Sequence, residues 1–97
     1  MEKRAHKYKL TLEHLATAKG EPSTHQPIQL AFDNHDDIFS IIERMQARDL
    51  FNDKNQSTEF AIGLKMFSEV MLKNRKLPLF EELGPAFSEF MKKLKSM

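Results

Sequence analysis

The chain has 97 residues, of which 40% are hydrophobic and 30% charged, the balance of an ordinary globular protein. It contains no cysteine, which excludes disulfides, thiolate nucleophiles and thiolate-bound metals. A net charge of +1, with acidic and basic residues mixed along most of the chain, argues against a nucleic-acid-binding surface. We therefore expect a single domain over residues 1–97 that binds no nucleic acid and carries no cofactor.

The hydropathy pattern indicates the cellular compartment. No apolar run approaches the roughly 18 residues of a membrane span, and the start at residues 1–6 leads into charged residues rather than into the apolar run of a signal peptide. The lack of cysteine fits a reducing environment. We expect a cytoplasmic protein that does not contact membranes.

The first predicted elements are two strands in which apolar and polar residues alternate with a period of two. Their apolar positions are Tyr8, Leu10, Leu12, Ile28, Leu30 and Phe32. Pro27 precedes the second run, where its missing N–H is harmless. The sequence therefore predicts an antiparallel hairpin with one apolar face. The connection from Ala16 to Gln26 is long for a hairpin, so it is either mobile or functional.

A helix is predicted to follow the second strand, because Asn34 is a suitable N-cap and both Asp36 and Asp37 place negative charge in the first turn. Its apolar stripe consists of Ile38, Ile41, Ile42 and Met45. Phe39 lies off this stripe. We expect Phe39 either to pack against a neighbouring element or to mark an interface.

Two further helices are predicted from apolar residues at helical spacing. The longer helix starts with Ser57 as its cap and runs to about Asn74, and the last helix starts at Gly84-Pro85 after a short turn. Their apolar positions are Phe60, Leu64, Phe67 and Met71 in the longer helix, and Phe87, Phe90, Met91 and Leu94 in the last one. We expect both of these faces to be buried.

Strands followed by helices predict an α+β fold, in which an N-terminal antiparallel two-stranded hairpin precedes three helices packed on one face. A two-stranded ribbon is unstable alone and has unpaired edges. Because unpaired strand edges attract another strand, and a second copy of the chain is always available, we expect a homodimer. The alternative is a monomer whose helices bury the ribbon.

Candidate chemistry gathers at residues 33–37, where His35 meets several carboxylates. Imidazole and carboxylate oxygen can bind a divalent metal. Neighbouring residues on one turn rarely converge on one ion, however, and the same residues suit a strand-to-helix junction. His35 is also suited to general-base chemistry, but no nucleophile stands in a recognisable relation to it. We therefore predict no catalytic residues and no metal ligands.

Several segments carry a resemblance that covers nearly the whole chain. They are Tyr8-Lys9-Leu10, His35-Asp36-Asp37-Ile38-Phe39, Gly63-Leu64-Lys65-Met66-Phe67 and Leu79-Phe80, followed by Phe87 and Phe90-Met91. In these segments the sequence resembles a family of small bacterial proteins catalogued as a domain of unknown function. The resemblance implies a bacterial origin and a compact α+β fold, and it brings no catalytic residue, cofactor or substrate. It points to the segments containing His35 and Lys65 as places for a shared site.

Taken together, these patterns favour a non-enzymatic bacterial protein-association module, an adaptor or regulator that acts as a homodimer and can bind a further protein. The candidate interface or site residues are His35, Asp36, Phe39 and Lys65. The alternative function is a small-ligand or divalent-metal binder. Its pocket would lie between the ribbon and the helices, with His35 and Asp36 at the mouth.

Overall fold

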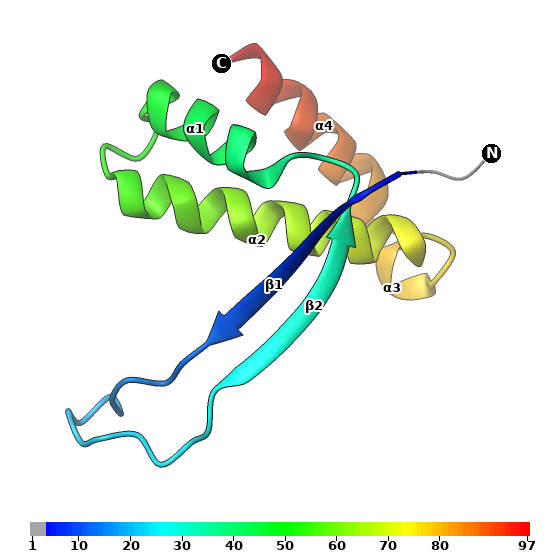
Figure 1. Ribbon diagram of the computed structural model, residues 1–97. Helices are drawn as coiled ribbons and strands as arrows, with labels where there is room; N and C mark the ends of the chain where they lie inside the picture. The colour runs from blue at the N-terminus through cyan, green and yellow to red at the C-terminus, as the bar shows by residue number, and fades with distance from the viewer. Residues whose placement is uncertain (1–3) are drawn as a thin grey trace.

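The computed structural model describes residues 4–97 and contains two strands followed by helices (Figure 1). The elements are β1 (His6–Leu12), β2 (Ile28–Asn34), α1 (Ile38–Arg48), α2 (Lys54–Lys73), α3 (Pro78–Glu81) and α4 (Leu83–Ser96). The predicted α+β order is confirmed, but the described residues form four helices and not three. The added helix is the single turn α3, which Pro78 opens because its fixed φ suits a first helical position. Residues 1–3 of the charged start lie outside the described range.

The two strands pair as the predicted antiparallel hairpin. Tyr8 lies opposite Phe32, Leu10 opposite Leu30, and Leu12 opposite Ile28. Side chains two residues apart share a face of a strand, so this register places all six apolar side chains on one face of the ribbon. The other face is mainly polar and carries Lys7 opposite Asp33 and Thr11 opposite Gln29.

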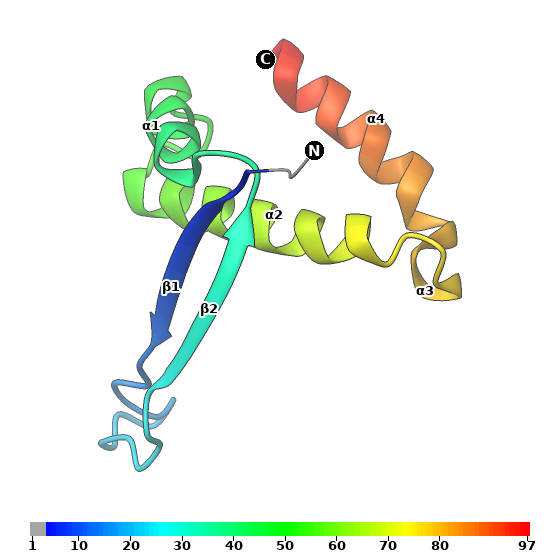
Figure 2. The same ribbon diagram turned by 45° about the vertical axis from the view of Figure 1, so that its right-hand side comes forward.

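The hairpin projects from the helices as an arm (Figures 1 and 2). The helices cover the apolar face only near the junction, since Leu12 and Ile28 at the far end are 65% and 63% exposed. The prediction that helices pack on one face of the hairpin therefore holds for one end of the ribbon. Beyond the strands, the connecting loop turns back at Gly20, whose φ of +87° favours glycine.

Two helix starts differ from the predictions. The N-cap of α1 is Asp37, whose carboxylate accepts hydrogen bonds from the N–H groups of Phe39 and Ser40. The N-cap of α2 is Asp53, so this helix begins before the predicted cap, and Ser57 is fully buried inside it. Both caps are aspartates immediately before the first helical residue, where a carboxylate is close to the free N–H groups and the helix dipole.

The helical core joins α1, α2 and α4. Its buried centre consists of Met45, Ala61 and Leu94, one residue from each helix. The side chains packed around this centre are Ile41, Ile42, Leu50, Phe60, Leu64 and Met91. Phe67 and Phe90 were both predicted on buried faces, but each is nearly half exposed. The apolar faces of α2 and α4 are wider than the area that the neighbouring helices cover. Within residues 4–97, no helix has the length and hydrophobicity needed to cross a membrane.

Candidate functional site

The hydroxyl of Tyr8 fastens the arm to the first helix. It accepts a hydrogen bond from the N–H of Ile38 at 2.9 Å and donates one to the carbonyl of Asp36 at 3.0 Å. The N–H groups of a first helical turn have no partner within their own helix, so the hydroxyl satisfies a group that the fold would otherwise leave open. The sequence pattern identified only the ring of Tyr8, because the partners of its hydroxyl lie far along the chain.

Asn34 is the second polar link at this junction, and it was wrongly predicted to be the N-cap of the helix. Its side chain is 1% exposed. The amide donates to the carbonyl of Lys65 in α2 at 3.2 Å, and the amide oxygen accepts from the N–H of Asp36 at 3.0 Å. The second bond closes a local Asx turn, which is a readable signal in the sequence. The first is a long-range contact that no local pattern contains.

Two of the candidate residues meet at the same place. The ammonium group of Lys65 forms a salt bridge with the carboxylate of Asp36, and the Lys65 side chain is only 17% exposed. The hydrogen bond from Lys65 is the main cause that holds the pKa of Asp36 below its ordinary value, with nearby cationic charge from Lys65 adding to it. Asp36 therefore stays ionised, and the pair connects the start of α1 to the middle of α2.

His35 lies near a different residue, Glu69 of α2. Its Nδ1 atom lies 3.6 Å from Oε1 of Glu69, which is an ion-pair distance when the imidazole is protonated but too long for a hydrogen bond. His35 and Asp36 thus diverge, toward Glu69 and Lys65 respectively. Among residues 4–97, no group of three His, Asp or Glu side chains is placed to hold a metal ion.

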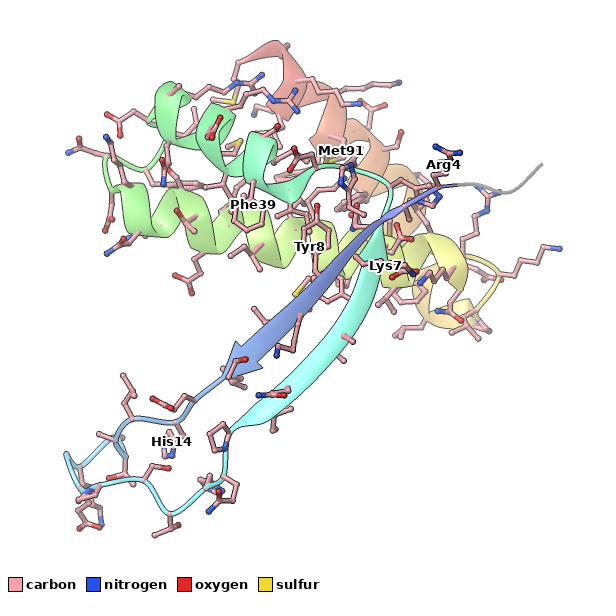
Figure 3. The ribbon with its side chains drawn as sticks, viewed as in Figure 1. Arg4, Lys7, Tyr8, His14, Phe39 and Met91 are labelled. Carbon is pink, nitrogen blue, oxygen red and sulfur yellow. The ribbon has the colours of Figure 1, made fainter. Side chains whose placement is uncertain are left out.

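Phe39 packs against a neighbouring element, which is the first of its two predicted alternatives, and its role at an interface stays a prediction. Its ring centroid lies 6.3 Å from that of Tyr8, and Tyr8 in turn stacks on Phe32 at 5.4 Å. Figure 3 shows Phe39 beside Tyr8 where the arm meets α1. The ring nevertheless remains 66% exposed. Phe39 therefore extends the apolar face of the hairpin onto the helix.

This extension produces a continuous surface, which we call the apolar strip. It consists of Phe39, Tyr8, Phe32, Leu10, Leu30, Leu12 and Ile28. The strip runs from α1 along one face of the arm toward its tip. Its exposure rises along the arm, because Tyr8 and Phe32 are partly covered at the junction while Leu12 and Ile28 are open.

A cavity of about 260 Å³ lies between α1, α2 and α4. Asp36 and Lys65 are part of its lining, so two of the candidate residues do border a pocket. The pocket differs in place from the predicted one, because its lining comes from three helices and Asp36 and includes no residue of the ribbon. His35 and Phe39 are not among its lining residues.

The comparison with protein families decides the family. A model described as a domain of unknown function with a solved structure, DUF3861, matches residues 6–96. The chain belongs to the DUF3861 family. A protein of unknown function from Pectobacterium atrosepticum has a crystal structure similar to that of this DUF3861 chain, with 32% sequence identity and a TM-score of 0.83. The match covers 97% of this chain and 100% of the other. No curated protein matches the sequence.

Proposed function

We propose that this DUF3861 chain is a non-enzymatic bacterial protein-association module that works in the cytoplasm as a homodimer, through its apolar strip. One observation carries the proposal: the strip is continuous, and Leu12, Ile28 and Phe39 along it are each about two-thirds exposed. Single exposed apolar side chains are normal on a protein surface. A contiguous apolar strip marks an interaction site.

The energy available from covering this strip is substantial. Fully burying one Leu, Ile or Phe side chain contributes roughly 1.5–3 kcal/mol, and the strip offers several such side chains on each copy. A two-stranded ribbon is marginally stable by itself. Covering its apolar face would therefore stabilise both the arm and the assembly.

A second copy of the chain is the partner that fits the strip best. A two-fold axis pairs the same surface patch on both subunits, so one strip can lie against its own copy without any other complementary surface. The opposite face of the ribbon carries Lys7, Lys9 and Asp33, with a salt bridge between Lys7 and Asp33, and is suited to water. Binding of a further protein, as an adaptor or regulator would require, remains a prediction.

The test compares the oligomeric state of two matched variants by sedimentation equilibrium at tens of micromolar protein. Ile28→Asp places a carboxylate on the strip, and Gln29→Asp places the same group one residue further along, on the polar face. We expect a dimer for the wild-type protein and for Gln29→Asp, and a monomer for Ile28→Asp. Phe39→Asp should act like Ile28→Asp while the far-ultraviolet circular dichroism stays unchanged.

Two outcomes would contradict the proposal. A wild-type protein that stays monomeric over the whole concentration range removes the homodimer. Equal dissociation of Ile28→Asp and Gln29→Asp would show that added charge, and not the apolar strip, controls association.

A further inference from the structure

The cavity between α1, α2 and α4 has an apolar floor supplied by all three helices. Its apolar side chains are Ile41 and Met45 from α1, Leu64 from α2, and Met91 and Leu94 from α4. Met45 and Leu94 also belong to the buried core, so the floor of the cavity is continuous with the core. Methionine has an unbranched, adaptable side chain, so Met45 and Met91 can adjust to the shape of an apolar ligand.

The rim of the cavity is strongly cationic. Four basic side chains border it, against one carboxylate, that of Asp36; they are Arg44, Arg48, Lys65 and Lys95. Lys65 is engaged by Asp36. Arg48 donates a hydrogen bond from Nη1 to the carbonyl of Leu94 at 2.8 Å, which ties α1 to α4 and offsets one carbonyl of the last turn of α4.

Two of the rim cations remain available to a ligand. The salt bridges formed within residues 4–97 involve neither Arg44 nor Lys95. Arg44 on α1 and Lys95 on α4 both line the cavity and are both exposed. A guanidinium and an ammonium at the edge of an apolar floor form a charge pattern complementary to a carboxylate.

We propose that this cavity binds a small amphipathic carboxylate, a free aliphatic acid of medium chain length. The chain would lie on the floor formed by Met45, Leu64 and Leu94, and the carboxylate would lie between Arg44 and Lys95. The ligand class follows from both surfaces together. A cation is repelled by the rim, and a small inorganic anion leaves the apolar floor uncovered.

The size of the cavity agrees with this ligand class. Its 260 Å³ lies between the roughly 150 Å³ of an engineered apolar cavity that binds benzene and the roughly 300 Å³ at which pockets for drug-sized ligands begin. A medium-chain acid is in the corresponding size range, whereas a peptide segment or a folded partner is too large to enter. The proposal is independent of the homodimer, because none of the residues that line the cavity belongs to the apolar strip.

The test is a titration of the full chain with octanoate at neutral pH, followed by calorimetry and by methyl NMR. We expect saturable binding at one site per chain, with shifts in the methyl signals of Met45, Met91 and Leu64. Octanol has the same chain without the charge, and acetate has the charge without a long chain. Because the carboxylate and the chain both contribute, each of these probes should bind about tenfold more weakly or worse.

Variants test the cationic rim. The double variant Arg44→Gln, Lys95→Gln should lose at least about tenfold in octanoate affinity, because both cations that would hold the carboxylate are removed. Lys92→Gln removes one cation from α4 that is paired with Glu89 and does not line the cavity, so it is a control for loss of positive charge outside the cavity and should bind normally. Far-ultraviolet circular dichroism verifies that each variant is folded.

Three results would overturn the inference. The first is no octanoate binding at millimolar concentration. The second is an equal loss of affinity in Lys92→Gln and in the double variant. The third is methyl shifts confined to Leu12 and Ile28, which would show that octanoate coats the apolar strip. These readouts differ from the oligomeric state, so each proposal can fail without the other.

Discussion

The substitution Tyr8→Phe removes a single oxygen atom from the junction between the arm and the helices. That oxygen accepts from the N–H of Ile38 and donates to the carbonyl of Asp36. The ring remains, so its stacking on Phe32 should be preserved. The substitution therefore measures the two hydrogen bonds and little else.

The expected loss follows from the burial of the groups left behind. Ile38 is 4% exposed, so its N–H has poor access to water once the hydroxyl is gone. An unsatisfied buried donor costs roughly 1–3 kcal/mol, and we expect the free energy of unfolding to fall by about 2 kcal/mol. For a domain of this size, that loss lowers the melting temperature by about 8–16 °C.

The assay is urea denaturation monitored by circular dichroism. All proteins must be compared at one concentration, because the stability of an associating protein depends on its concentration. Thr11→Val, which removes an exposed hydroxyl from the same strand, is the control and should not lower stability. A Tyr8→Phe loss below about 0.5 kcal/mol, or one no larger than in the control, would refute the role assigned to the hydroxyl.

Two further predictions concern the same junction. Asn34→Ala should lower the free energy of unfolding by about 2 kcal/mol in urea denaturation, because it breaks the bonds to Lys65 and Asp36; unchanged stability would contradict this. The lowered pKa of Asp36 means that its pairing with Lys65 stabilises the fold above the unfolded value of 3.8 and is lost as the pH falls through the folded-state pKa. Asp36→Asn should thus be less stable than wild type at neutral pH, with a difference that disappears in acid; a difference that does not vary with pH would argue against the linkage.

The hairpin could be predicted because a period of two determines both the strands and which of their side chains share a face. The same pattern says nothing about what covers that face. Whether the helices reach Leu12 and Ile28 depends on the direction in which the arm leaves α1, which is a tertiary property. The alternation alone therefore cannot decide how much of the ribbon the helices bury.

The candidate site shows the same division between local and long-range signals. Phe39 could be identified as a candidate surface residue because it lies off the apolar stripe of its own helix. The assignments of Asn34 and Ser57 as N-caps were wrong, because the nearby Asp37 and Asp53 cap the two helices instead. The buried position of Asn34 depends on its hydrogen bond to a carbonyl of α2, which no local pattern contains. The pairing of Asp36 with Lys65 and the cavity beside it require three helices to converge, which no single segment of the sequence encodes.

The length of the arm amplifies any change in its orientation at the base. At about 3.3 Å per residue, its seven-residue strands extend roughly 23 Å from the junction. A rotation of about 10° at the base therefore moves the far end of the strands by about 4 Å, comparable to the spacing between neighbouring strands. The base is oriented by the side chains of Tyr8 and Asn34. Small changes at these two positions would thus move the far end of the arm by about 4 Å while leaving every residue at the tip unaltered.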